Sequence, residues 1–502
     1  MYLLGYDIGS SSIKVALVNT STSETTIVQS PETEMEILAP QPDWAEQHPE
    51  TWWQHLCIAT KKLLQKTGVN PAEIVGIGIA YQMHGLVVVD KKQQVLRPSI
   101  IWCDSRAVEI GNRAFDEIGQ EQCLSHLLNS PGNFTAAKLA WVMQNEPEIF
   151  EKTEKFMLPG DYIAMRLTGE AMTTPSGLSE GILWDFQKNE PAQFLLDYFG
   201  FEKKLIPNLT PTFSLQGQLT PAAAEATGLR SGIPIAYRAG DQPNNALSLN
   251  VLNPGEVAAT GGTSGVVYAV LDQPTYDPKS RVNGFLHVNH GLPTHPSSLI
   301  PHPSNRIGIL LCINGAGSQY AWVRKNMAGG NHSYSEMERL AASVPVGADG
   351  LRILPFGNGA ERMLENRETG ARVSNIHFNR HGQAHFYRAA LEGIAFSFVY
   401  GIGILKEMGL NLQVMRVGND NLFQSAIFAN TIASLAGCRI ELLETTGAAG
   451  AAKAAGVATG VYGSLAEAVQ GGEVVKVYEP ETAPGLYEEA FEAWRQELED
   501  VV

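Results

Sequence analysis

The sequence predicts an α/β protein made of two similarly built domains, and three observations support this prediction. A strand, a turn of small residues and a second strand open the chain at residues 2–18. A segment of the same type returns at residues 257–270. Further strand and helix patterns lie between them, and a chain of 502 residues is long enough for two or three domains with substantial cores.

The first segment places apolar, partly β-branched residues at 2–6 and 13–18 on either side of a small-residue turn that starts at Asp7. A helix is predicted from Pro49, a residue favoured at the first helical position, to Gly68, which stops it. Further strands are predicted at residues 74–80 and 86–90, and further helices at residues 135–145 and 160–168.

The second segment mirrors the first, and two such copies about 250 residues apart indicate two domains of similar construction. We expect an N-terminal domain over residues 1–247 and a C-terminal domain over residues 254–460. Residues 461–502 would form a peripheral extension that ends in an amphipathic helix. Chance is the alternative explanation of the repeat, because small-residue turns between strands are common.

Composition limits the classes of ligand. A hydrophobic content of 44% and a charged content of 18% are those of an ordinary globular protein. The formal net charge of −16 argues against a broad basic surface for nucleic acid or anionic lipid. A polyphosphate ligand would have to be held locally, by backbone N–H groups, a bound cation or one or two lysines.

Cysteine usage and the N-terminus predict a cytoplasmic protein. The five cysteines form no CxxC pair, which favours a reducing compartment. The first residues lack a basic stretch and reach Asp7 early, so no signal peptide is expected. No apolar run is expected to reach the roughly 18–20 residues that span a bilayer.

Each of the two small-residue turns could bind phosphate. The first turn consists of Gly9, Ser10, Ser11 and Ser12. Glycine lets a phosphate approach the backbone closely, serine adds donors, and residues 261–265 could act in the same way. Asp7 is an acceptor suited to Mg²⁺ or its waters, and Lys14 could add positive charge. Taken alone, the first motif could equally be a plain hairpin turn; neither a Walker loop nor a GxGxxG motif occurs.

Asp241 follows a glycine at the end of a predicted strand, a position from which it could reach into a cleft. The alternative is an N-cap for a helix over residues 242–249, and the two roles are compatible. Two phosphate-type turns with a carboxylate for each are the parts that phosphoryl transfer needs. That reaction requires positioning, charge neutralisation and a base at the acceptor hydroxyl.

Several segments in this order resemble the FGGY carbohydrate kinases of the actin-like, sugar-kinase and heat-shock ATPase superfamily. They are YDIGSSSIKVALVN (6–19), DWAEQHPETWW (43–53), IAYQMHG (79–85), IIWCDSRA (100–107), LPGDYIAMRLTGE (158–170), RAGDQPNNA (238–246), TGGTSG (260–265), LPFGNGAERML (354–364) and YRAALEGIAF (387–396). QMHG is most similar to the xylulose kinases, since glycerol kinases carry a charged pair at the positions of Met83 and His84.

The resemblance implies two ribonuclease-H-like domains around a central cleft in which Mg-ATP phosphorylates D-xylulose. Asp241 would be the general base, and Asp7 and Asp241 the metal-organising acids. The sugar-binding residues implied are Met83, His84, Trp102, Asp241 and Gln242. The ATP-binding residues implied are Gly9, Ser10, Ser11, Ser12, Lys14, Gly262, Thr263, Ser264, Gly317, Gly418 and Asn421. Asp104 and Arg106 match a segment that connects the domains in the family.

Departures from the family pattern leave the details of nucleotide selection and the identity of the sugar open. Residues 416–422 replace a run of three glycines near the adenosine, and Cys103 and Gln242 replace common asparagines. A kinase for another ketose or polyol, such as ribulose or glycerol, is the first alternative. An actin-like or chaperone ATPase is the second, and it would need a protein-binding module or a filament interface.

The partners expected are the sugar and ATP, without nucleic acid or membrane, and a homodimer is the candidate assembly. A loose group of histidines lies in a Pro- and Ser-rich stretch: His287, His290, His295 and His302. These surroundings indicate a loop rather than a structural metal site.

Overall fold

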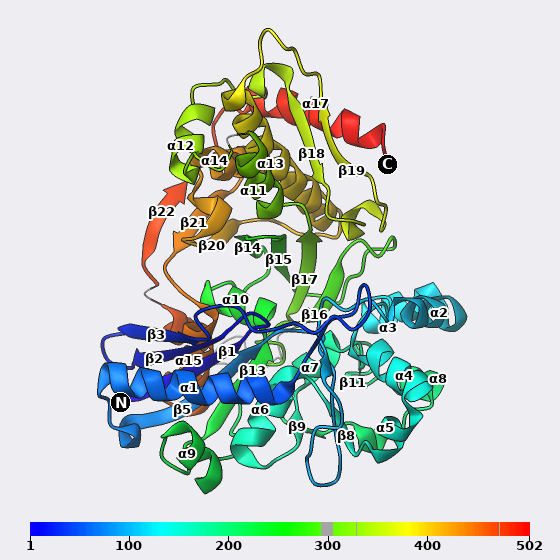
Figure 1. The fold of residues 1–502 in the computed structure, drawn as a ribbon, viewed down its shortest axis with the longest axis vertical. Helices are drawn as coiled ribbons and strands as arrows, with labels where there is room; N and C mark the ends of the chain where they lie inside the picture. Colours follow the sequence, from blue (N-terminus) through cyan, green and yellow to red (C-terminus); the bar gives the residue numbers. More distant parts are fainter. Residues whose placement is uncertain (293–304, 328, 471) are drawn as a thin grey trace. The chain divides into compact units, whose positions relative to one another are not determined.

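The computed structural model describes residues 1–292, 305–327, 329–470 and 472–502, and the chain divides into two compact units (Figure 1). Unit 1 comprises Met1–Asn250, Gly284–Ile307 and Thr445–Gly471. Unit 2 comprises Val251–Asn283, Gly308–Glu444 and Gly472–Val502. The first boundary lies between the predicted limits of 247 and 254. Residues 445–460, which the sequence placed in the C-terminal domain, lie in unit 1 instead.

The main sheet of unit 1 has the strand order β13-β5-β1-β2-β3. Its strands are β1 (Tyr2–Ile8), β2 (Ile13–Asn19), β3 (Thr25–Ser30), β5 (Ile74–Tyr81) and β13 (Ile235–Gly240). β1 and β2 form an antiparallel hairpin, as predicted, while β5 runs parallel to β1 and β13 runs parallel to β5. Asp7 belongs to β1 rather than to the turn.

Opposite faces of this sheet are covered by α1 (Pro49–Thr67) and α15 (Gly447–Ala458) (Figure 1). Alternate residues of a strand point to opposite faces. Leu4 and Tyr6 accordingly share a core with α1, whereas Leu3 packs with alanines of α15. The predicted helix over residues 49–68 is confirmed, and Gly68 ends it in the left-handed conformation.

Smaller elements surround the main sheet of unit 1. Its short strands are β4 (Glu46–Gln47), β6 (Val87–Val89), β7 (Ser99–Ile100), β8 (Lys155–Met157), β9 (Met172–Thr173), β10 (Trp184–Asp185), β11 (Glu190–Pro191) and β12 (Asn208–Leu209). Its other helices are α2 (Val108–Ile118), α3 (Gln120–Leu127), α4 (Thr135–Asn145), α5 (Pro147–Lys152), α6 (Pro159–Thr168), α7 (Pro175–Glu180), α8 (Gln193–Phe199), α9 (Pro221–Thr227), α10 (Asp241–Ser248) and α16 (Leu465–Val469). α4 and α6 confirm the helices predicted at 135–145 and 160–168.

Unit 2 is built around a sheet in which β17, β15, β14, β20, β21 and β22 follow one another. The bounds are β14 (Glu256–Gly261), β15 (Gly265–Leu271), β17 (Ile307–Ile313), β20 (Val414–Gly418), β21 (Arg439–Leu443) and β22 (Val474–Tyr478). β16 (Asn283–Leu286) carries the chain from unit 2 into unit 1. β18 (Arg352–Phe356) and β19 (Gly370–Ser374) form a separate antiparallel pair.

The two sheets repeat one arrangement. In unit 1 the β1–β2 hairpin is followed along one side by the parallel strands β5 and β13. In unit 2 the β14–β15 hairpin is followed in the same way by β20 and β21. The strand orders β3-β2-β1-β5-β13 and β17-β15-β14-β20-β21 therefore correspond, and the duplication predicted from the two turns is confirmed.

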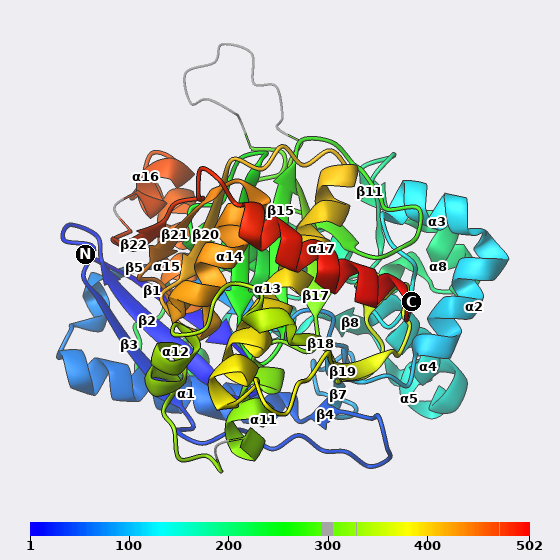
Figure 2. The same cartoon turned by 90° about the horizontal axis from the view of Figure 1, so that it is seen from above.

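The helices of unit 2 are α11 (Gly317–Met327), α12 (Tyr334–Ala341), α13 (Gln383–Glu407), α14 (Ala426–Ala436) and α17 (Gly485–Glu499). α17, which is labelled near the C-terminus in Figure 2, packs through the fully buried Trp494. The Trp494 indole N–H donates to the Ile353 carbonyl at 2.9 Å. Residues 472–502 also supply β22 to the sheet. This stretch is therefore a structural part of unit 2, more than the peripheral extension expected.

α13 corrects the expectation that no apolar run is long enough to span a bilayer. This helix has 25 residues, and the mean hydropathy of its most apolar stretch is 1.4. Among the described residues it is the one helix that is long and apolar enough to cross a membrane. The sequence reasoning missed it because Arg388 and Glu392 interrupt the apolar run, although they pair with each other. Since 78% of the window is buried, α13 has the character of a core helix.

The structure also shows the surroundings of the five cysteines and of two of the four histidines singled out in the sequence. All five cysteines are free thiols. His287 is buried next to β16, and the imidazole of His290 accepts a hydrogen bond from the Arg306 N–H. His295 and His302 lie outside the described residues.

Candidate active site

The candidate site of unit 1 lies at the carboxyl ends of three adjacent parallel strands. Asp7 pairs in register with Ala80 near the ends of β1 and β5, and Gly240 pairs with Tyr81 at the ends of β13 and β5. The loops that follow these strands leave the sheet along one edge, which is where α/β sheets place their ligands. Met83 and His84 follow β5, and Asp241 follows β13, so the topology brings these predicted residues together.

Asp7 and Asp241 form an acid pair. Desolvation within the site, followed by the charge of Asp7, raises the pKa of Asp241 to about 7. Hydrogen bonding from Gln242 opposes this rise. Desolvation also raises the pKa of Asp7, and the positive charge of Lys14 opposes the effect. Two neighbouring carboxyl groups with raised pKa values create a place where a bound cation is favoured.

The start of α15 holds Asp7 closely. A Cβ atom added to Gly447 would lie 2.9 Å from Asp7 Oδ2, so a residue with a side chain would have to displace the carboxylate. Asn244 of α10 donates to the Gly447 carbonyl at 2.9 Å and ties α10 to the same point. Lys14 lies directly opposite Asp7 in the β1–β2 pair, on the same face of the sheet.

The carboxyl groups of Asp7 and Asp241 fit a magnesium ion by the kind and number of ligands that they offer. Among the residues described, no group of three or more His, Cys, Asp or Glu side chains could hold a metal. A cation held by the carboxyl groups of Asp7 and Asp241 would take its other ligands from water or substrate. Mg²⁺ is commonly bound in this way at phosphate-transfer sites.

Asp241 is the first residue of α10 and not its N-cap, in contrast to the alternative considered from the sequence. The helix begins at Asp241 itself, and Gly240 occupies the N-cap position without a side-chain bond. A Cβ atom on Gly240 would lie 2.6 Å from Met83 Cγ and 2.9 Å from Glu180 Oε2. Gly240 thus allows Met83 and Glu180 to pack against the start of this helix.

His84 is held in a fixed orientation. Its φ of 62° is in the left-handed region, which non-glycine residues rarely adopt. Its Nδ1 lies 2.9 Å from the Glu180 carbonyl oxygen, and because a carbonyl only accepts, Nδ1 carries the proton. The ring packs edge-on against Phe134, with 4.7 Å between the ring centroids, and its centroid lies 5.4 Å from that of Phe285. A neutral His84 ring therefore has its lone pair on Nε2.

Trp102 lies near the first phosphate-type turn. It is about half exposed, and its indole Nε1 lies 3.5 Å from Ser10 Oγ. The turn itself is closed by a bond from the Gly9 N–H to the Ser12 carbonyl at 3.2 Å. The segment with Asp104 and Arg106 lies wholly within unit 1, and the chain passes between the units elsewhere.

Unit 2 contains a cavity of about 730 Å³ at the start of α11. Of the predicted nucleotide-binding residues, Gly262, Thr263, Gly317 and Asn421 line it. Ser264 belongs to the same turn and Gly418 ends β20, but neither is among the lining residues. The cavity has the size of a site for a nucleotide-sized ligand.

Gly317 joins the second turn to α11. Its N–H donates to the Gly262 carbonyl at 2.9 Å, and Ser318 donates to the Thr263 carbonyl at 3.0 Å. A Cβ atom on Gly317 would lie 2.4 Å from that Gly262 oxygen, so only glycine allows this contact without a shift of the backbone. The rings of Tyr320 and Tyr334, which the sequence did not indicate, stack at 5.6 Å beside the cavity.

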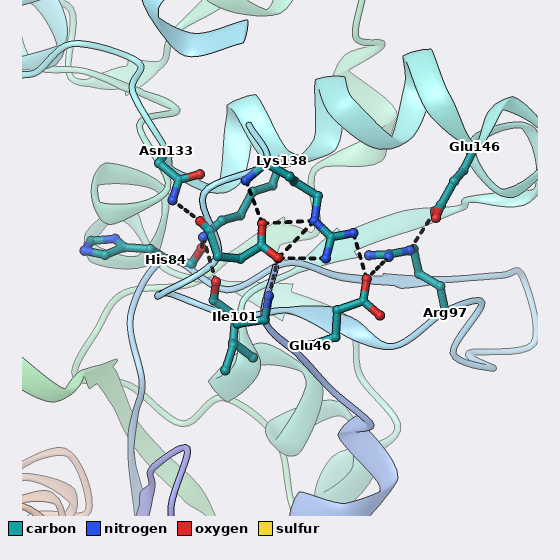
Figure 3. Close-up of polar contacts among 10 residues, drawn as sticks. Glu46, His84, Arg97, Ile101, Asn133, Lys138 and Glu146 are labelled. Atoms are coloured by element: carbon teal, nitrogen blue, oxygen red, sulfur yellow. Dashed lines mark hydrogen bonds and ion pairs between the residues drawn. The ribbon is translucent and has the colours of Figure 1, made fainter. Parts of the chain in front are cut away.

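Sequence reasoning missed three residues of unit 1, two near Asp241 and one near the His84 loop. Glu180 is 2% exposed, and desolvation, with a further contribution from Asp241, raises its pKa well above the usual range. Tyr81 lies beside it and contributes to the same electrostatics. Lys138 is fully buried next to the His84 loop (Figure 3). A single lysine in the apolar stretch TAAKLAWV was a usable signal for the last of these.

Comparison with known proteins identifies the class. Residues 2–248 match the N-terminal domain, and residues 257–459 the C-terminal domain, of the FGGY family of carbohydrate kinases. The xylulose kinase of Bacillus subtilis is 30% identical over 482 residues, which cover 93% of this chain and 90% of that protein. The xylulose kinase of Escherichia coli is 29% identical and covers 93% and 92%.

A solved structure supports the same fold. The structure reported as a xylulose kinase from Brucella ovis superimposes with a TM-score of 0.89 at 24% identity, covering 100% of this chain and 99% of the other. The fold and site define a two-domain carbohydrate kinase. The chain belongs to the FGGY family of carbohydrate kinases.

Proposed function

We propose that this enzyme transfers the γ-phosphoryl group of ATP to D-xylulose, which gives D-xylulose 5-phosphate. The carbohydrate kinase family and its xylulose kinase relatives support this reaction. The observation that carries the proposal is the position of Asp241. Its carboxyl group lies with the acid of Asp7 and beside Gly240, against which Met83 packs, at one edge of the sheet.

Asp241 is the proposed general base, which removes the proton from the attacking sugar hydroxyl. A base works best when its pKa is near the working pH, and the pKa of Asp241 is raised to about 7. The same residue would be a poor base at the usual pKa of an exposed aspartate. The desolvated setting beside Asp7 thus contributes directly to the proposed role.

Asp7 and Asp241 are the proposed holders of Mg²⁺, directly or through water. The ion would neutralise charge on the phosphates of ATP. Lys14, opposite Asp7 in the hairpin, and the backbone of Gly9 to Ser12 are proposed to assist at the phosphates.

Met83 and His84 are the proposed sugar contacts. Because His84 Nδ1 donates to the Glu180 carbonyl, Nε2 of the neutral ring is an acceptor and would take a hydrogen bond from a sugar hydroxyl. Met83 would pack against the carbon chain, and Gln242 and Trp102 would add polar contacts. A few fixed polar groups in a partly apolar surround are typical of small-molecule sites.

The cavity of unit 2 is the proposed nucleotide site. Gly262, Thr263 and Ser264 would contact phosphate, and Gly317, Gly418 and Asn421 would lie near the adenosine. We also propose a cytoplasmic location, in keeping with five free thiols, and a homodimer as the assembly to test by light scattering.

A coupled ADP-release assay with D-xylulose, L-xylulose, the ribuloses, a hexulose and glycerol tests the function. D-xylulose should give the highest kcat/KM, and omission of sugar should reduce ATP turnover to a small background. Preference for another ketose or polyol would replace the substrate and keep the kinase. Rapid sugar-independent ATP turnover would instead support an ATPase of the actin-like or chaperone type.

A further inference from the structure

We propose that Lys138 of α4 is a positioning residue that fixes the loop carrying Met83 and His84. The inference rests on the proposed function, in which His84 contacts the sugar. Lys138 does not touch the substrate in this scheme. Its effect passes through the backbone of the loop, and it would set how well the sugar is bound rather than how ATP is bound.

The ammonium group of Lys138 joins two separate loops (Figure 3). Its Nζ donates to the His84 carbonyl at 2.9 Å and to the Ile101 carbonyl at 3.1 Å. The first carbonyl belongs to the proposed sugar-contacting loop, and the second precedes Trp102. Lys138 is 0% exposed, so water does not compete for these bonds.

The start of α4 holds the same loop at further points. Thr135 Oγ1 donates to the Gly85 carbonyl at 3.3 Å, directly after the carbonyl that Lys138 binds. Phe134, immediately before the helix, packs edge-on against the His84 ring at 4.7 Å. Phe134, directly before α4, and Thr135 and Lys138 in its first turn therefore contact two successive loop residues. The loop with Met83 and His84 thus packs against the whole start of α4, and Lys138 is one of several contacts.

The backbone conformation of His84 explains why its loop needs these contacts. A left-handed φ of 62° costs energy for a residue with a side chain, so surrounding contacts must hold it. The Lys138 bond fixes the carbonyl of His84, and the Glu180 carbonyl fixes its Nδ1. Together they determine where Nε2 points. Without the Lys138 bond, the peptide after His84 is held less firmly and the ring loses one of its constraints.

A chain of buried ion pairs holds Lys138 and α4 in place. Asp104 lies near Lys138 and binds Arg106 at 2.7 Å, and Arg106 binds Glu46 at 2.7 Å. Glu46 in turn binds Arg97 at 2.5 Å, and Arg97 binds Glu146 at 2.6 Å, directly after the end of α4 (Figure 3). Three basic and three acidic groups alternate along this path, which starts in α4 and ends at the residue directly after it.

Burial lowers the pKa of Lys138 to about 7, and the charge of Asp104 opposes this effect. A neutral amine still carries two N–H donors, so both carbonyl bonds can form on either side of this pKa. The role of Lys138 is therefore one of donor geometry. Burying an amine in an otherwise apolar helix is costly, and this cost is compensated only where specific acceptors exist.

The test compares Lys138→Met with Lys155→Met in the full-length enzyme. Methionine keeps an unbranched chain of similar length and removes all N–H donors. Lys155 is the matched control because its Nζ also donates to two backbone carbonyls, those of Lys204 at 2.5 Å and Ile206 at 3.1 Å. Neither acceptor belongs to the His84 loop or to the segment at Ile101.

The first readout is steady-state kinetics with ATP and D-xylulose. Lys138→Met should raise the KM for D-xylulose by about tenfold to 100-fold, which lies within the range for leaving a buried acceptor without its donor. The KM for ATP should stay within about twofold, and Lys155→Met should change neither constant by more than that. Similar sugar KM values for Lys138→Met and the wild type would overturn the proposal.

The second readout does not depend on the identity of the sugar. In enzyme labelled with ¹⁵N-histidine, the side-chain signals of His84, assigned with His84→Gln, should show a proton on Nδ1. They should shift or broaden in Lys138→Met and stay in place in Lys155→Met. Unchanged His84 signals in Lys138→Met would overturn the proposal. If the wild-type enzyme does not phosphorylate D-xylulose but the His84 signals still shift in Lys138→Met, only the proposed substrate is overturned.

If Lys138→Met does not fold, Lys138→Gln takes its place, because its amide keeps two donors on a shorter chain. It should fold and still raise the sugar KM, since one amide cannot reach both carbonyls as Lys138 does. Folded Lys138→Gln with wild-type sugar KM and wild-type His84 signals would count against Lys138 as a positioning residue.

Discussion

The β1–β2 hairpin of unit 1 and the β14–β15 hairpin of unit 2 share a topology and differ in chemistry. Asp7 is the second-to-last residue of β1, and Thr260 has the same place in β14. Asp241 follows β13 directly, and Glu444 follows the corresponding strand β21. Asp241 lies beside another acid, whereas Glu444 is exposed and accepts a hydrogen bond from Asn419 at 3.1 Å.

The repeated fold supplies equivalent positions in the two units, and the residues at those positions supply the chemistry. In unit 1 the strand ends carry carboxyl groups whose desolvation suits a base and a cation. In unit 2 the equivalent turn is neutral and small, and Gly317 packs onto its backbone at the wall of a cavity. The proposed catalytic charges thus belong to one copy, and the proposed nucleotide pocket to the other.

The largest effect is expected from Asp241→Asn, which keeps the shape and removes the proton acceptor. Turnover should fall by about 10²–10⁴-fold, the range typical of the loss of a general base. Sugar binding, measured by calorimetry, should stay within about tenfold. The matched control is Glu444→Gln at the equivalent place in unit 2, for which near-normal turnover is expected. Comparable losses in both variants would break the distinction between the two copies.

Asp7→Ala should raise the Mg²⁺ concentration needed for half-maximal rate, with a rate loss of about tenfold or more at limiting Mg²⁺, because phosphate charge is no longer organised. Thr260→Ala, the equivalent change in unit 2, should leave the magnesium titration nearly unchanged. The titrations use ATP at saturation and both variants side by side. An unaltered titration for Asp7→Ala would leave Asp7 as a structural residue of β1.

His84→Ala should weaken the use of D-xylulose and spare ATP. Removing a hydrogen-bonding partner from a sugar hydroxyl costs about 1–3 kcal/mol, or roughly 5- to 150-fold in kcat/KM. The KM for ATP should stay within about twofold. If the variant instead weakened ATP and spared the sugar, the pocket would be misplaced and the xylulose proposal would lose its main support.

The pH dependence of kcat/KM should show the state of Asp241. The base must be unprotonated, so activity should be lost as the pH falls through its pKa of about 7, by about tenfold per pH unit on the acid side. Bound Mg²⁺ favours the ionised form, so the apparent value should lie at or below 7 at saturating Mg²⁺. An acid limb that is unchanged in Asp241→Asn would assign it to another group.

Hairpins and helix ends could be predicted because their signals are local. Apolar strands around small residues fixed the positions of β1, β2, β14 and β15, and Gly68 marked the end of α1. The return of residues 445–471 to unit 1 had no comparable signal, since the alanine-rich α15 shows no distinctive face. Only close approach explains it: a Cβ atom on Gly5 would lie 1.9 Å from the Ala448 carbonyl oxygen.

The candidate site divides in the same way. Asp7 and Asp241 could be chosen from the sequence because a turn and a strand end mark them, and His84 because its segment resembles the family. Glu180 could not, since its place beside Asp241 depends on how α7 packs against β13. The stacked Tyr320 and Tyr334 beside the cavity were missed for a similar reason, because they come from two different helices.

The smallest effect is expected from Gly317→Ala in unit 2. The new Cβ atom would lie 2.4 Å from the Gly262 carbonyl oxygen, so the turn or the start of α11 must shift by a fraction of an ångström. Strain of about 1 kcal/mol, at the low end for such crowding, should raise the KM for ATP by about fivefold and leave the sugar KM unchanged.

Gly403→Ala in α13 is the matched control, because nothing lies within 4 Å of its Cβ position. The control should bind ATP normally and gain slightly in stability, since alanine favours a helix over glycine. A rise in sugar KM for Gly317→Ala, with ATP unaffected, would contradict the assignment of the nucleotide to the unit 2 cavity. It would also remove the contrast between a neutral turn for nucleotide and an acidic edge for sugar.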